Sequence, residues 1–238
     1  MNRLDKELVA RKLVLSRSQA ESYIKLGSVR VNNLIVTKPG ELVSAEDKII
    51  VASEQYVSRA ALKLASIAEL FQLDFAGAVV LDVGSSTGGF TDYALQHGAS
   101  KVVAVDVGTN QLHPVLRADS RVELHEKTDI RQFITNEKFT YVVADVSFIS
   151  LTLILPAVKK LVQKNTQLIM MCKPQFEAGK EQINKGVVKN SAMRRQILRD
   201  FEAWLLKNGF VIMDKADSQV AGTKGNVERF FLAKKRVK

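Results

Sequence analysis

The sequence predicts an α/β protein built on an open, mostly parallel sheet and preceded by a small, separate α+β unit. From residue 58 onwards, short apolar segments of strand character alternate with amphipathic segments, which is typical of a doubly wound parallel sheet. The last two strand segments have only a short connection that contains glycine, and this predicts an antiparallel hairpin at the edge of the sheet. We expect strands at 79–83, 101–106, 122–124, 140–144, 167–172, 209–213 and 227–232. We expect helices at 90–97, 111–118, 151–163 and 191–207, with another that begins at Ser58.

The first 53 residues are predicted to form a compact module of two helices and a small twisted sheet. Leu4, Leu8 and Val9 recur at helical spacing. Ser16 can cap a second helix, which Gly27 would end. Short strand segments follow at 29–31, 34–36 and 48–51. The predicted organisation is therefore a module at 1–53, a linker at 54–58 and a sheet domain at 59–238.

Composition limits the classes of protein to which the chain can belong. With 238 residues and 46% hydrophobic content, it can bury a sizeable core. The single cysteine, Cys172, excludes an internal disulfide, and no signal-peptide pattern opens the sequence. No apolar stretch approaches the ~20 residues that a membrane helix requires. These features predict a soluble, cytoplasmic protein without a membrane partner.

Positive charge is concentrated in three segments of a chain whose net charge is +10. Residues 1–30 carry a net charge of +4, and residues 173–199 and 224–238 carry +5 each, whereas the remainder carries −4. Such clustering is expected if the three segments line one track for a polyanion. The alternative interpretation is that these are ordinary solvated loops and tails.

A glycine-rich turn follows the strand segment at 79–83, where Asp82 precedes Gly84, Gly88 and Gly89. The spacing matches neither the dinucleotide fingerprint nor a P-loop, which would need a lysine for phosphate. It suits a cofactor with an amino-acid tail and a cationic centre, namely S-adenosylmethionine. The turn alone fits a ligand-free strand–helix connection equally well. Asp106 favours the cofactor, because a carboxylate at the end of the next strand can accept both hydroxyls of a ribose.

Four charged residues occur where the apolar pattern favours none: Lys63, Asp145, Lys173 and Glu228. Asp145 and Lys173 end successive strand segments, at the edge of a parallel sheet where ligands bind. Bare charges are costly to bury, so these groups are expected to pair or to serve a site. Each one alone also has a structural explanation, such as a helix cap or a lysine that reaches solvent.

The N-terminal module resembles the S4-type RNA-binding domain. The resemblance is carried by Ser16, Arg17, Ala20, Ile24, Gly27, Val29, Val31 and Asn32, and then by Asp47, Ile49 and Val51. It implies that basic helices bind structured RNA through shape and phosphates. With the basic segment after Lys173, the expected RNA contacts are Arg3, Arg11, Lys12, Arg17, Lys25, Arg30, Lys180, Lys185, Lys189, Arg194 and Arg195. The tail at 234–236 is expected to hold the same RNA backbone.

The sheet domain resembles the FtsJ-like 2′-O-methyltransferases, and the whole chain resembles the TlyA, or hemolysin A, family of ribosomal RNA 2′-O-methyltransferases. The matching segments are 58–64, 81–92, 105–108, 144–150, 173–179 and 225–228. The resemblance implies a Rossmann-like sheet that binds S-adenosylmethionine, and it places the family's catalytic tetrad on Lys63, Asp145, Lys173 and Glu228. Expected cofactor contacts are Asp82, Gly84, Ser85, Gly88, Asp106 and Asp129. The chain departs from the family pattern at Ser85, Asp129, Gln219, Thr223 and Arg229.

The implied activity is methylation of a ribose 2′-hydroxyl in ribosomal RNA, at a cytidine and in the large subunit, without a metal ion. Lys173 is the candidate that takes the hydroxyl proton or stabilises the developing oxyanion. The main alternative is an RNA-binding ribosome-assembly factor with a vestigial methyltransferase domain. A nicotinamide-dependent oxidoreductase is disfavoured by the missing fingerprint. A pore former is disfavoured because no membrane-spanning pattern is present. The oligomeric state stays open.

Overall fold

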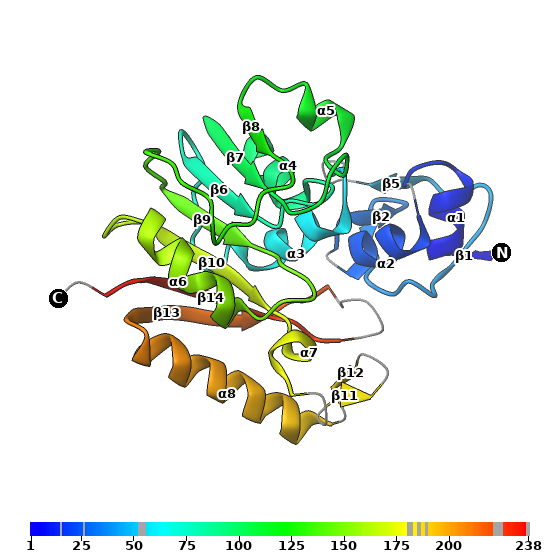
Figure 1. Cartoon of the computed structure of the whole chain (residues 1–238). Coiled ribbons are helices and arrows are strands. Elements are labelled where there is room, and N and C mark those ends of the chain that lie inside the picture. Colours follow the sequence, from blue (N-terminus) through cyan, green and yellow to red (C-terminus); the bar gives the residue numbers. More distant parts are fainter. Residues whose placement is uncertain are drawn as a thin grey trace.

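The computed structural model describes residues 1–14, 16–25, 27–51, 56–179, 183–184, 187–188, 190–220 and 226–236 (Figure 1). Three expected RNA contacts, Lys180, Lys185 and Lys189, lie outside these residues, as do Thr223 and the first two residues of the expected linker.

The main domain is built on a seven-stranded sheet with the order β13-β14-β10-β9-β6-β7-β8. The five consecutive strands β10, β9, β6, β7 and β8 are parallel to one another, whereas β14 runs antiparallel to both β10 and β13. This confirms the mostly parallel α/β sheet with an antiparallel hairpin. The bounds are β6 (Val79–Val83), β7 (Lys101–Val105), β8 (Val122–His125), β9 (Tyr141–Ala144), β10 (Gln167–Cys172), β13 (Phe210–Asp217) and β14 (Arg229–Lys235).

Helices cover both faces of this sheet (Figure 1). One core contains α3 (Arg59–Ala68) and α4 (Gly89–Gln96) with one set of strand side chains, for example Val80 and Val102. The other contains α6 (Leu151–Leu161) and α8 (Ser191–Lys207) with the alternate set, for example Leu81 and Val103. Successive strand side chains point to opposite faces, so strands buried on both sides must be apolar throughout. That requirement explains why these strands could be predicted from the sequence.

The hairpin lies at the edge of the sheet, as expected, with β13 outermost and β14 between β13 and β10. One expectation about it needs correction. Strand β14 begins at Arg229, so Glu228 precedes the strand rather than lying within it. Because β14 is an interior strand, Glu228 is 2% exposed instead of being a residue on an open edge.

Proline explains two further differences in the main domain. The helix expected at 111–118 is only α5 (Pro114–Arg117), because Pro114 lacks an N–H and starts the helix, and the His113 side chain caps it. A short helix that was not expected, α7 (Pro174–Glu177), starts in the same way directly after Lys173. The sequence also did not indicate the small strand pair β11 (Ile183–Asn184) and β12 (Val187–Val188).

The N-terminal module contains the two expected helices, α1 (Leu4–Ala10) and α2 (Arg17–Lys25). The expected strands are present as β2 (Val29–Val31), β3 (Leu34–Ile35) and β5 (Ile49–Val51), which form one sheet in the order β3-β2-β5. A second small pair, β1 (Asn2–Arg3) with β4 (Leu42–Val43), joins the start of the chain to the module. Leu4, Leu8 and Ile24 are fully buried between the helices and these strands.

The module packs against the sheet domain beside α3 (Figure 1). The Tyr56 backbone N–H donates to Tyr23 Oη at 3.3 Å, and the Gln19 amide donates to the Tyr56 carbonyl at 3.5 Å. The Val57 N–H donates to Asp92 Oδ2 at 2.7 Å, on α4. Tyr56 and Val57 therefore link the module and the sheet domain by hydrogen bonds. Among the helices that the structure describes, none combines the length and apolar character needed to cross a membrane.

Candidate active site

The glycine-rich turn lies where the strand order reverses, between β6 and β9. In open α/β sheets, this switch point opens a crevice at the carboxyl ends of the strands. Gly84 has a φ of +81°, and a Cβ there would lie 2.9 Å from the Asp145 carbonyl oxygen. The close approach of the two strand ends therefore requires glycine at this position.

Gly88 has a different role in the same turn. It is the N-cap of α4 with a φ of +93°, and a Cβ there would overlap Leu112 and Leu116. Gly88 is not among the residues that line the cavities described below. Its observed role is thus to let α4 begin tightly against the segment that contains α5.

The four charged residues singled out by the sequence form two ion pairs. Lys173 Nζ lies 2.6 Å from Asp145 Oδ1 and donates a hydrogen bond to Ser147 Oγ at 2.7 Å. Lys63 Nζ lies 2.5 Å from Glu228 Oε2. The side chains of all four are at most 16% exposed, so each charge is largely removed from water and is compensated by its partner.

Strand register brings the two pairs to the same end of the sheet. Cys172 pairs with Arg229 across β10 and β14, so Lys173 and Glu228 are the next residues beyond this rung. On the other side of β10, Met170 pairs with Ala144 of β9, and Asp145 follows. Neighbouring strands lie ~4.8 Å apart. Asp145 and Lys173 therefore follow the ends of β9 and β10, Glu228 precedes the start of the antiparallel β14, and Lys63 reaches Glu228 from α3.

Two cavities meet at Asp145. The larger, of about 570 Å³, opens along the ends of β6, β7 and β9 and is lined by Asp106, Asp129 and Phe148, among others. The smaller, of about 120 Å³, is lined by Asp82, Ser85 and Lys173, among others. Both are lined by Gly84, Ser86, Asp145 and Ser147, so they adjoin. Lys63 and Glu228 line neither cavity.

The two outer carboxylates of the larger cavity already have partners in the protein. Asp106 accepts hydrogen bonds from the backbone N–H groups of Ser86 at 2.8 Å and Gly108 at 2.6 Å, and so fixes the glycine-rich turn. Asp129 is paired with Arg131 at 2.5 Å, and this guanidinium lowers the pKa of the Asp129 carboxyl. Arg131 also lines the cavity and was not identified from the sequence, although it is only two residues away.

The smaller cavity holds polar atoms without partners. Asp82 is buried and accepts a hydrogen bond from Thr91 Oγ1 at 2.7 Å, and burial raises the pKa of its carboxyl to about 7. Asp82 Oδ1 and Ser85 Oγ are buried without a hydrogen-bond partner in the described part of the chain. Buried polar atoms are nearly always paired, so these atoms at the cavity wall fit a polar ligand.

Two further residues at the site were not singled out from the sequence. Ser147 positions the Lys173 ammonium. Phe148 is 91% exposed at the rim of the larger cavity and has a φ of +65°, and its ring lies 5.2 Å from that of Phe176. A bulky residue with positive φ is unusual. Both residues lie in the segment 144–150 that carried part of the resemblance, but nothing in their residue types marked them individually.

Some expected RNA contacts are used inside the protein. Arg11 pairs with Glu7 at 2.9 Å and donates to backbone carbonyls of the 44–47 turn. Arg3 and Arg17 both contact the buried Asp5 and lower the pKa of that carboxyl to about 2. These three arginines hold the module together.

The remaining expected contacts differ in exposure. Arg194 pairs with Asp217 at 2.7 Å and donates to the Val227 carbonyl at 3.0 Å, which ties α8 to the start of β14. Among the members of the predicted set that the structure describes, Lys12, Lys25, Arg30 and Arg195 are exposed, and Arg3 and Arg17 also remain partly exposed.

A parallel sheet with one antiparallel strand, a glycine turn at its switch point and two lysine–carboxylate ion pairs at the same end of the sheet are the features of a methyltransferase of the Rossmann-like class. Comparison with known proteins supports this class. A family model for the FtsJ-like methyltransferase matches residues 56–236, and one for the S4 domain matches residues 2–49. The chain belongs to the FtsJ-like methyltransferase family, within the TlyA group that carries an S4 domain.

Three relatives support that membership. The 16S/23S rRNA (cytidine-2′-O)-methyltransferase TlyA of Mycobacterium tuberculosis is 39% identical over 96% of this chain and 88% of its own length. The 23S rRNA (cytidine-2′-O)-methyltransferase TlyA of Campylobacter jejuni is 42% identical over 77% of this chain and 73% of its own. A solved structure of a candidate hemolysin from Streptococcus thermophilus has 38% identity and a TM-score of 0.75, over 98% of this chain and 88% of its own.

Proposed function

We propose that this protein transfers a methyl group from S-adenosylmethionine to the 2′-hydroxyl of a cytidine ribose in large-subunit ribosomal RNA. The observation that carries the proposal is the Lys173–Asp145 ion pair, which lies at the wall of a cavity beside the glycine-rich turn. The relatives named for cytidine 2′-O-methylation of ribosomal RNA support the substrate class. The names of both relatives include 23S rRNA, which supports the large subunit as the source of the substrate RNA.

The two adjoining cavities fit the parts of this cofactor. The larger offers Asp106 to the ribose hydroxyls and an aliphatic wall, with Val107 and Ile130, to an adenine ring. The smaller offers the unpaired Asp82 Oδ1 and Ser85 Oγ to the amino-acid tail. When bound, S-adenosylmethionine supplies an electrophilic methyl group on a sulfonium centre. Asp129 is held by Arg131, so an adenine amino group would share this carboxylate with the guanidinium.

The charged residues would activate the ribose hydroxyl that attacks the methyl group. A ribose 2′-hydroxyl is a weak nucleophile and must lose its proton as it attacks. Lys173 can take that proton when its amine is neutral, or stabilise the developing oxyanion when it is charged. Asp145 and Ser147 hold the Lys173 Nζ in position, and the Lys63–Glu228 ion pair stabilises the same end of the sheet. Alignment of the reacting groups would supply much of the acceleration.

Phe148 gives the rim a surface for the target base. Its ring is exposed at the mouth of the larger cavity. Proteins commonly bind single-stranded RNA by stacking its bases on such aromatic side chains. The S4 domain would bind structured RNA nearby, through the exposed Lys12, Lys25 and Arg30.

The direct test is incubation of the protein with S-adenosylmethionine and unmethylated ribosomal subunits, followed by mapping of 2′-O-methyl marks on both subunit RNAs. The proposal expects one new mark, at a cytidine of the large subunit. A mark on the small subunit would correct the subunit assignment. RNA binding without any mark, despite S-adenosylmethionine binding by calorimetry, would favour the assembly-factor alternative.

A further inference from the structure

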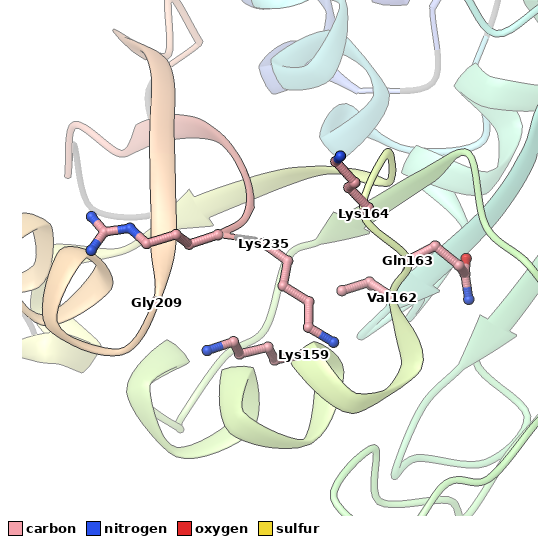
Figure 2. Close-up of a pocket in the computed structure, with 7 residues that line it drawn as sticks. Lys159, Val162, Gln163, Lys164, Gly209 and Lys235 are labelled. Atoms are coloured by element: carbon pink, nitrogen blue, oxygen red, sulfur yellow. The ribbon is translucent and has the colours of Figure 1, made fainter. Parts of the chain in front are cut away.

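A cluster of cations lies at the end of the sheet that faces away from the candidate active site. It comes from the last turn of α6, the following loop and the end of β14 (Figure 2). We call it the far basic surface, and its members are Lys159, Lys160, Lys164, Lys234, Lys235 and Arg236. The sequence indicated only the tail at 234–236, because the other three cations lie outside the basic segments.

The far basic surface is a strip rather than a single point. A cavity of about 550 Å³ is lined by Lys159, Lys164, Lys235 and Arg236 (Figure 2). Two further hollows, of about 330 Å³ and 370 Å³, also reach Lys235 and extend the strip to Lys234 on one side and Lys160 on the other. The cations are therefore spread along a surface instead of converging on one small anion.

Negative charge is missing from this strip. None of the residues that line the three hollows is aspartate or glutamate. Within the described residues, none of the six cations lies within 4.0 Å of a carboxylate oxygen. Elsewhere, the half-buried Lys101 and the exposed Arg117 and Lys215 each pair with a glutamate. Uncompensated like charges repel one another, and a bound polyanion removes that repulsion.

The scaffold beneath the strip is well ordered by specific contacts. Lys159 Nζ donates to the carbonyl of Asn208 at 2.5 Å and lies 5.4 Å from the Phe210 ring centroid. The Arg236 N–H donates to the Gly209 carbonyl at 2.9 Å. These contacts join α6, the end of α8 and the end of β14. Lys160, Lys164, Lys234 and Arg236 extend from this base into solvent.

We propose that the far basic surface binds the phosphate backbone of the ribosomal RNA substrate, at a place remote from the methylated nucleotide. The proposal rests on the proposed function for the identity of the RNA. Strand β10 separates the surface, near Gln167, from Lys173, and its six residues span roughly 20 Å at ~3.3 Å per residue. An RNA that contacts both places must be a large folded one. The tail at 234–236 therefore contacts a different part of the RNA from the segment around Arg194.

The test compares a triple variant, Lys160→Gln/Lys164→Gln/Lys234→Gln, with the wild-type chain. Affinity for isolated large ribosomal subunits is measured over a range of salt concentrations. Each phosphate contact contributes ~0.7–0.9 to the slope of log affinity against log salt. The triple variant should lose about two to three units of slope and bind at least about tenfold more weakly at 0.15 M salt. The rate of methyl transfer at saturating subunits should be unchanged.

A matched control removes the same charge from the ion-paired cations, as Lys101→Gln/Arg117→Gln/Lys215→Gln. It should keep the wild-type affinity and slope, because these cations are already compensated. Equal affinity of the far-surface variant and the wild type would overturn the proposal. It would favour an acidic protein as the partner of the far basic surface. Failure of the wild type to methylate RNA would count against the proposed function instead, and the binding comparison would still decide the role of the strip.

Discussion

Lys173 Nζ and Asp145 Oδ1 lie 2.6 Å apart at the carboxyl ends of neighbouring strands β10 and β9. The pair is largely buried, yet both residues line the cavity that adjoins the glycine-rich turn. A charge pair kept at a cavity wall, with Ser147 as a third partner, is poised to meet a ligand's proton or oxyanion. The proposed methyl transfer requires this ion pair.

The second ion pair should be chiefly structural. Glu228→Ala would leave the Lys63 ammonium buried without its partner, so it should cost about 3–5 kcal/mol of unfolding free energy. The double variant Lys63→Met/Glu228→Gln removes both charges and should recover much of that loss. Urea unfolding of both variants and the wild type measures this. Equal losses in the two variants would show that the loss does not come from an unpaired Lys63 charge, and would contradict this explanation.

Gly84 offers a matched comparison with Gly77, since both have positive φ. Alanine at either position strains the backbone by about 1–3 kcal/mol. Only at Gly84 does the added Cβ also meet another strand, at the Asp145 carbonyl, whereas nothing lies within 4 Å at Gly77. Gly84→Ala should therefore abolish S-adenosylmethionine binding by calorimetry, while Gly77→Ala keeps it. Loss of binding in both variants would point to general unfolding rather than to the switch point.

Asp82 should make stability depend on pH. Burial raises the pKa of its carboxyl in the folded protein to about 7, well above the ~3.9 of an unfolded chain. Between these values the folded state binds more protons than the unfolded state, so the Asp82 contribution to stability falls as pH rises from about 4 to about 7.

Asp82→Asn removes this contribution, because its amide does not titrate. The stability of the variant relative to the wild type should therefore increase steadily across pH 4 to 7 and level off above about pH 7. Thermal unfolding at a series of pH values gives the comparison. A difference between the two proteins that does not change with pH would contradict the raised pKa.

The parallel strands were predictable because burial on both faces leaves a continuous apolar run, as at 141–144 and 168–172. Lys173 and Asp145 were predictable because they interrupt such runs. Which lysine pairs with which carboxylate was not, because the pairing depends on β14 lying between β10 and β13. The same strand order explains why Glu228 is buried.

Charge was the feature that sequence reasoning handled least well. Arg11 is a basic residue in a basic segment, yet the fold uses it to bind Glu7 and backbone carbonyls. Lys160 and Lys164 looked unremarkable, because Lys234 joins them only when β14 returns beside β10. Neither a cation's partner nor its distant neighbours can be read from local composition.

Methyl transfer by Lys173→Ala tests the central claim most directly. The variant is assayed on large ribosomal subunits beside Lys138→Ala, which removes an exposed lysine away from the candidate site. Loss of Lys173 should slow transfer by about 10²–10⁴-fold while calorimetry still detects S-adenosylmethionine binding, and Lys138→Ala should match the wild type. Wild-type turnover by Lys173→Ala would contradict the account.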